Sequence, residues 1–137
     1  MSADTVTLVE VGPRDGFQPI GPLVPTSDKL HMIAQLYRAG LRRMEATAFV
    51  SDAAVPQLAD AADVLQMANA LADLDVQVLV PNLRHAQRAI EAGARHVAFV
   101  LSVSEKHNRN MCGARHWNRP RNSPESWTSC LLASKFE

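Results

Sequence analysis

The strongest constraint on the fold is a regular alternation of two apolar patterns along the first hundred residues. Short apolar runs rich in β-branched residues predict strands at 5–11, 43–49, 76–80 and 96–103. Between them, apolar residues recur at helical spacing and predict helices at 26–40, 56–72 and 83–92. The first of these helices has cap residues at Thr26 to Asp28 and ends at Gly40; Gly93 ends the third. The repeat of roughly 30 residues, the size of one strand-plus-crossover unit, predicts an α/β fold with a parallel sheet covered by helices.

Two closures of such a sheet are open at this point. It can be a doubly wound open sheet, or it can be part of a (β/α)8 barrel. A complete barrel takes about 250 residues, so four strands are half of one. The nearly continuous apolar runs at 76–80 and 96–103 are typical of strands that are buried on both faces.

The composition changes abruptly near residue 110. Beyond Asn110 no period of 2 or 3.6 persists, and both tryptophans and both cysteines fall in this part of the chain. We expect residues 1–110 to form one domain and residues 111–137 to be a disordered or divergent tail. A frameshift is a sharper hypothesis, because GC-rich codon choices let the neighbouring frame spell VRRAPLEPAPQLARELDE, in which the stretch LARELDE has helical composition.

Charge and composition argue against several classes of partner. The 14 basic and 14 acidic residues balance, so there is no electrostatic reason to expect nucleic acid or an anionic membrane. The sequence has no apolar run of transmembrane length, and its first residues do not resemble a secretory signal. Two cysteines late in the chain do not make a disulfide framework, so we expect a cytoplasmic protein.

Polar residues follow or end every expected strand. In chain order they are Arg14, Asp15, Glu45, Asn82, Ser102, Ser104, Glu105 and His107. The carboxyl ends of parallel strands meet at one edge of the sheet, where functional groups collect in α/β folds. We therefore expect these side chains to lie at a common edge.

Each of these residues also has a structural interpretation. Taken alone, Arg14 and Asp15 are better explained as an ion pair that ties down the first loop. Glu45 lies between Met44 and Ala46, which predicts a half-buried carboxylate in need of a partner, and Arg14 is within reach. Asp15 offers hard oxygen ligands suited to magnesium or manganese, but one carboxylate cannot hold a metal.

The run VEVGPRDGFQ resembles the opening strand and loop of the hydroxymethylglutaryl-CoA lyase family. Three further segments resemble the next strands of that family: AGLRRMEATAFVSDAAVPQLAD, VLVPNL and EAGARHVAFVLSVSEKHN. The resemblance extends from residue 5 to about residue 110. It implies that residues 1–110 are the N-terminal half of a (β/α)8 barrel, about its first four β/α units, and that residues 111–137 are an unrelated irregular tail.

The resemblance also implies an activity and a set of site residues. The family cleaves 3-hydroxy-3-methylglutaryl-CoA to acetyl-CoA and acetoacetate in leucine catabolism, with a divalent metal, Mg²⁺ or Mn²⁺. Arg14 matches the catalytic arginine and, with Gln18, is expected to bind the acyl-CoA substrate. Asp15 matches a metal-binding aspartate, and Glu45 matches a catalytic acidic residue near the metal. The ligand set is incomplete in this chain, because the family's later His-x-His pair, asparagine and cysteine loop have no counterpart.

Departures from the family pattern keep other functions open. Phe17, Ile20, Ala48 and Asp52 stand where the family usually has other residues, which leaves the acyl substrate open. We expect a truncated lyase that is inactive on its own. The alternatives are a non-catalytic half-barrel or assembly partner, and a lyase or synthase of the same superfamily with another acyl substrate. Open sheet edges would favour a homo-oligomer or poor solubility.

Overall fold

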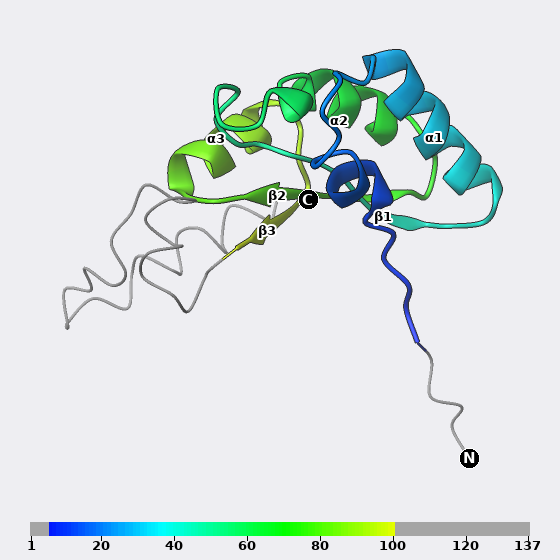
Figure 1. Ribbon diagram of the computed structural model, residues 1–137. Helices are drawn as coiled ribbons and strands as arrows, with labels where there is room; N and C mark the ends of the chain where they lie inside the picture. The colour runs from blue at the N-terminus through cyan, green and yellow to red at the C-terminus, as the bar shows by residue number, and fades with distance from the viewer. Residues whose placement is uncertain (1–5, 101–137) are drawn as a thin grey trace, which may run out of the picture.

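The computed structural model describes residues 6–100. A parallel sheet of three strands lies beneath a layer of helices in Figure 1. The strands are β1 (Arg43–Ala48), β2 (Asp75–Val80) and β3 (His96–Phe99), in the spatial order β1-β2-β3. The helices are α1 (Thr26–Arg38), α2 (Ala61–Asn69) and α3 (Leu83–Glu91). The expected alternation and parallel pairing are confirmed for these elements.

The first expected strand is reduced to a single bridge, so the prediction of a strand at 5–11 is wrong. Glu10 pairs with Met44, and its N–H donates to the carbonyl of Arg43 at 3.0 Å. Val6 and Leu8 are exposed, and the blue segment that carries them runs away from the sheet (Figure 1). Among the described strands this segment bridges only β1, and a single bridge is too little pairing to hold an extended run.

The helix expected at 56–72 is split in two. Pro56–Leu58 forms a 3-10 turn, η2, and α2 begins only at Ala61. The side chain of Asp60, at the junction, is bound by Lys29 at 2.7 Å instead of capping the helix. The buried face of α2 consists of Ala61, Val64, Leu65 and Ala68. Ala62 is exposed. No helix within residues 6–100 is long and apolar enough to cross a membrane.

The two glycines expected to end helices do so. Gly40 follows α1 with a φ of 100° and Gly93 follows α3 with a φ of 93°. A backbone φ in this range is disfavoured for any residue with a Cβ, which is why a glycine ends each helix. The expected cap at Thr26 to Asp28 is wrong, because Pro25 precedes the first helical residue and no side chain caps it.

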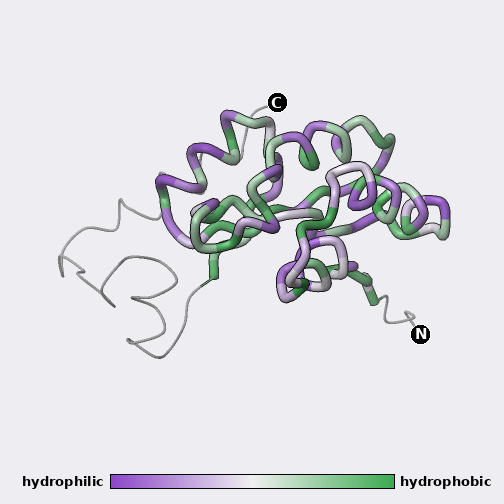
Figure 2. Tube along the Cα trace, turned by 45° about the horizontal axis from the view of Figure 1, so that its top comes forward, coloured by the Kyte–Doolittle hydropathy of each residue, from purple (hydrophilic) through white to green (hydrophobic). Residues whose placement is uncertain are grey.

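The core lies between the sheet and the helices. Its best-buried members are Ile33, Met44, Val64, Leu65, Val78 and Val80. In Figure 2 the helices alternate hydrophilic and hydrophobic stretches, as expected for helices with one face on a core. Burial on both faces, expected for β2 and β3, holds only in part for β2, which alternates buried and half-buried residues, and is wrong for β3, whose end residues are exposed. The most deeply buried strand is β1, whose residues 44–48 are all buried. The described helices cover one face of the sheet only (Figure 1), and β1 is additionally packed against η1, the turn at Gly12–Gly16.

Candidate active site

A tight turn presents the first candidate residues. Residues Gly12–Gly16 form a short π-helical turn, η1, which packs against β1. The N–H groups of Arg14 and Asp15 both donate to the carbonyl of Val11, at 3.1 and 2.7 Å. The N–H of Gln18 donates to the carbonyl of Arg14 at 3.2 Å. The turn therefore places Arg14, Asp15 and Gln18 close together on a hydrogen-bonded backbone.

The glycine at the start of this turn is required by a close contact. The N–H of Gly12 donates to Oε1 of Glu10 at 2.7 Å. A Cβ on Gly12 would lie 2.8 Å from that oxygen and 3.1 Å from the terminal methyl of Met32. An alanine would force the Glu10 carboxylate away and break this hydrogen bond. Sequence reasoning missed the role of Glu10, although a glutamate two residues before a glycine turn is able to accept such a bond.

The Arg14 guanidinium is the centre of the site. Its Nε donates to Oε1 of Glu45, and its Nη1 donates to Oδ1 of Asp15 at 2.6 Å and to Oε1 of Gln18 at 3.3 Å. The structure thus brings together all four residues that the resemblance marked. Because one of the carboxylates is buried, the cluster is more than an isolated surface ion pair.

Glu45 is held at the point where β1 is irregular. Its N–H donates to the carbonyl of Glu10 at 2.8 Å, and the register with β2 shifts between Glu45 and Thr47. Such bulges bend a strand and re-aim a side chain, often beside an active site. The Glu45 side chain is 8% exposed, and Arg14, 16% exposed, supplies the partner that a buried carboxylate needs.

Asp15 faces the solvent, and its side chain is 64% exposed. A carboxylate in this position is accessible to a cation. Residues 6–100 contain no group of three acidic, histidine or cysteine side chains that could hold a metal. Asp15 therefore fits one ligand of a divalent metal, but the described residues do not make up a metal site.

Asn82 has a structural task at the end of β2. Its side-chain oxygen accepts the N–H of His85 at 3.1 Å and so caps α3. The imidazole Nδ1 of His85 lies 2.8 Å from the same oxygen. Partial burial, and then the cations of Arg88 and Arg84, lower the pKa of His85, while the Asp52 carboxylate opposes the shift. The other expected edge residues, Ser102, Ser104, Glu105 and His107, lie outside the described residues.

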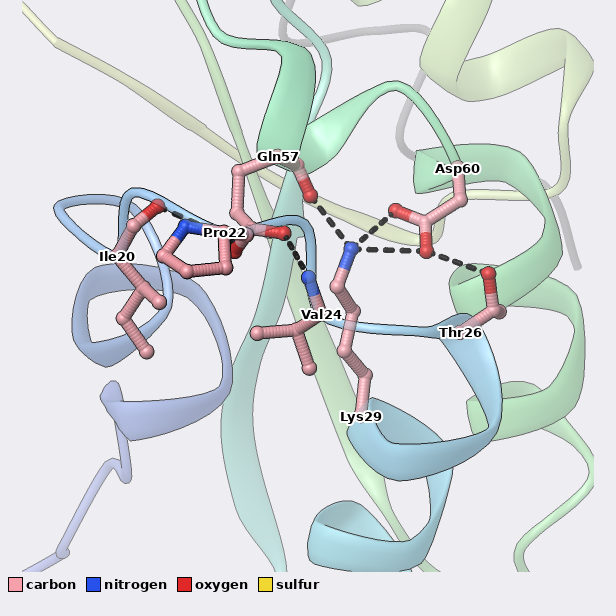
Figure 3. A network of polar contacts seen from close by, with 7 residues as sticks. All are labelled: Ile20, Pro22, Val24, Thr26, Lys29, Gln57 and Asp60. Atoms are coloured by element: carbon pink, nitrogen blue, oxygen red, sulfur yellow. Dashed lines mark hydrogen bonds and ion pairs between the residues drawn. The ribbon is translucent and has the colours of Figure 1, made fainter.

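A second polar network beside this site was missed from the sequence. Figure 3 shows Lys29, Gln57 and Asp60 joined by hydrogen bonds, with Thr26 and the loop after η1 attached to them. Lys29 is buried although it is a lysine. A usable signal was present, because Lys29 lies four residues before Ile33 on the buried face of α1. A lysine on such a face predicts a buried anionic partner.

A family model described as HMGL-like matches residues 5–118. This match covers most of the chain. The chain belongs to the HMGL-like family. The resemblance stated from the sequence is thereby confirmed.

Individual relatives of this HMGL-like chain agree with the match. The mitochondrial hydroxymethylglutaryl-CoA lyase of Arabidopsis thaliana is 51% identical over 100 residues, which are 73% of this chain and 21% of that protein. The cytoplasmic 3-hydroxy-3-methylglutaryl-CoA lyase of Rattus norvegicus is 38% identical over 148 aligned positions, covering 96% of this chain and 42% of that protein. The HMGL-like chain thus spans less than half the length of these curated relatives.

A solved structure agrees with the fold. The HMG-CoA lyase of Acinetobacter baumannii, in complex with coenzyme A and 3-methylmalate, superposes with a TM-score of 0.79 at 36% identity. The match covers 96% of the HMGL-like chain and 43% of that lyase chain. The expectation of part of a (β/α)8 barrel is therefore confirmed. The domain boundary expected at 110 stays a prediction, and the tail lies outside the described residues.

The expectation of a cytoplasmic protein is corrected by these relatives. Matching lyases from Arabidopsis thaliana, Gallus gallus and Mus musculus are mitochondrial, while others from Rattus norvegicus and Mus musculus are cytoplasmic. Two cysteines without a framework speak against a disulfide-built fold, and they do not select one compartment among those that keep thiols reduced.

Proposed function

We propose that the Arg14 cluster is the arginine-bearing part of a hydroxymethylglutaryl-CoA lyase active site. The reaction is the retro-Claisen cleavage of 3-hydroxy-3-methylglutaryl-CoA to acetyl-CoA and acetoacetate, a step of leucine catabolism. The observation that carries the proposal is that one guanidinium contacts Glu45, Asp15 and Gln18 at once. Membership of the family and the likeness to a lyase that binds coenzyme A support it.

The proposed chemistry assigns Arg14 to charge that develops during cleavage. The C3 hydroxyl loses its proton, the C2–C3 bond breaks, and the hydroxyl carbon becomes the ketone of acetoacetate. The electron pair of the broken bond moves onto the acetyl-CoA fragment as an enolate, which takes a proton at C2. A preorganised cation such as Arg14 stabilises the enolate oxygen in the transition state.

The neighbours of Arg14 keep that cation in place. Glu45 is buried on β1 and holds Nε, so it acts on the substrate through the orientation of Arg14. Gln18 is bonded to Nη1 through its amide oxygen, which leaves its amide nitrogen to bind an oxygen of the substrate. The two contacts come from a strand and from a turn, so they fix the plane of the guanidinium from different directions.

Asp15 is the proposed metal ligand, and its exposure suits that role. A bound Mg²⁺ or Mn²⁺ would polarise oxygens of the hydroxy-acid part of the substrate. Residues 6–100 contain no group of three acidic, histidine or cysteine side chains that could hold the cation, so Asp15 would supply only part of its ligands.

The test uses the full chain and a chimera. In the chimera, the segment of the Arabidopsis thaliana lyase that matches this chain is replaced by the corresponding residues of the chain, so that the remaining lyase sequence completes the barrel. With Mg²⁺ or Mn²⁺, the chimera should release acetoacetate from 3-hydroxy-3-methylglutaryl-CoA, and the full chain alone should not. A folded chimera that releases none would refute the proposal and favour a non-catalytic half-barrel. Cleavage of a different acyl-CoA would correct the substrate.

A further inference from the structure

The side chain of Gln57 binds the loop after η1 at three backbone positions. Its Nε2 donates to the carbonyls of Pro22 and Ile20, at 2.9 and 3.2 Å. Its Oε1 accepts the N–H of Val24 at 2.8 Å. These contacts cross more than thirty residues of sequence, and Gln57 itself is 4% exposed. One amide therefore satisfies three backbone groups of a loop that has no regular structure.

Gln57 is itself anchored to two helices. Its main-chain carbonyl accepts from the ammonium of Lys29, which also binds both oxygens of Asp60, at 2.7 and 2.8 Å. Thr26, at the start of α1, donates to Asp60 at 2.7 Å. Figure 3 shows the resulting chain of contacts from α1 through Asp60 and Lys29 to Gln57 and then to the loop. A buried, fully satisfied network of this kind is stiff, because each member loses a partner if another moves.

The loop that Gln57 holds is continuous with the site. It begins two residues after Gln18, whose side chain contacts Arg14. A cavity of about 230 Å³ is lined by residues of both segments, among them Gln18, Ile20 and Leu23 together with Val55, Pro56 and Gln57. The wall beside Gln18 therefore has its shape fixed by the amide of Gln57.

We propose that Gln57 is a positioning residue, which holds the 20–24 loop and thereby fixes Gln18 against the Arg14 guanidinium. The effect of Gln57 on catalysis rests on the proposed function. The coupling between Gln57 and Gln18 does not, because it can be measured without the lyase reaction. A residue that only stabilised the fold would loosen all parts of the molecule together. A positioning residue loosens residues 18–24 and leaves the sheet unchanged.

The test is backbone amide hydrogen exchange, measured by NMR on the ¹⁵N-labelled full chain. Gln57→Glu keeps the shape and the acceptor for Val24 but removes the two N–H donors. Gln57→Asn shortens the amide without adding a charge. The matched control is Gln66→Glu, on an exposed position of α2. The reference amide is the N–H of Asp75, the first residue of β2, which donates to the carbonyl of Arg42 at 2.8 Å.

In both Gln57 variants the backbone amides of Gln18 and Val24 should exchange on the order of tenfold faster than in the parent, while the exchange rate at Asp75 stays unchanged. The Gln66→Glu control should exchange like the parent at all three amides. Equal acceleration at all three amides, or loss of the fold in both variants, would show a structural residue only and overturn the proposal. Unchanged exchange at Gln18 would also overturn it. Failure of the lyase assay alone leaves this readout intact, so the two proposals fail separately.

Discussion

The guanidinium of Arg14 donates from Nε to a carboxylate oxygen of Glu45, 31 positions further along the chain. The contact joins the η1 turn to buried strand β1, and both side chains are largely shielded from water. Removing one partner of such a pair leaves the other charge without compensation, which costs more than the intact pair contributes. Stability should therefore depend on Glu45 more than on the exposed Asp15.

Glu45→Gln should lower the free energy of unfolding of the full chain by about 1–3 kcal/mol, because the Arg14 charge loses its buried counter-charge. Asp15→Asn is the matched control, since it removes the other carboxylate that binds Arg14 at an exposed site. Its cost should stay below about 1 kcal/mol. Urea denaturation followed by circular dichroism measures both. Equal losses in the two variants would show that burial of Glu45 does not matter.

Gly12→Ala should destabilise the η1 turn by about 1 kcal/mol. The new Cβ displaces the Glu10 carboxylate, which ends a flexible side chain, so the cost is mainly the hydrogen bond lost by the Gly12 N–H. Gly16→Ala serves as the control, because a Cβ there meets nothing within 4 Å. Thermal melts compare the two. A Gly16 variant that is the less stable of the pair would contradict this account of the turn.

The lowered pKa of His85 predicts a loss of stability in acid. Because burial and the Arg88 and Arg84 cations favour neutral imidazole in the folded state, the unfolded state binds the proton more readily. The contribution is complete above the unfolded pKa of about 6.5 and is lost as the pH falls through the lower folded pKa. His85→Gln should show a shallower fall in melting temperature between about pH 7 and 5 than the parent. His31→Gln, on an exposed position, should not; an identical slope in the parent and the His85 variant would refute the assignment.

Local signals in the sequence were enough to predict most of the fold. Glycines at 40 and 93 ended helices because only glycine takes their backbone conformation readily, and strand β2 was a dense apolar run next to a proline. The prediction of a strand at 5–11 failed because a strand is held by its neighbours in the sheet, and its own residues do not show how many neighbours it has. The prediction of one helix within 56–72 missed the break at Asp60, whose side chain binds Lys29, a partner 31 residues away.

The candidate site could be predicted in part. Arg14, Asp15 and Glu45 were expected at one edge of a parallel sheet, and the family resemblance marked all three as site residues. The structure does pair them, but from the η1 turn and from within β1 rather than from two strand ends. The support around them could not be predicted in the same way. Gln57 contacts three backbone groups whose position depends on the path of an irregular loop, and no periodicity encodes that path.

We expect the full chain to self-associate. Val6, Leu8, Leu23 and Leu83 are each more than half exposed within the described residues, and exposed apolar side chains favour association between chains. Sedimentation velocity across a concentration series should show a dimer or larger species. The double variant Val6→Thr and Leu8→Thr should shift the distribution toward monomer. A parent that is monomeric at all concentrations would contradict the expectation.

The central claim is that Arg14 stabilises charge in the cleavage of 3-hydroxy-3-methylglutaryl-CoA, and the most direct test is the turnover of the Arabidopsis chimera carrying Arg14→Gln. Acetoacetate release under saturating substrate and Mg²⁺ or Mn²⁺ should fall on the order of 100- to 1,000-fold, the usual effect of removing one preorganised donor. Arg38→Gln, at an exposed position near the end of α1, is the control and should keep the parent rate. Turnover of the Arg14 variant within a factor of about three of the parent would contradict the account, since so small a change leaves no room for a transition-state role.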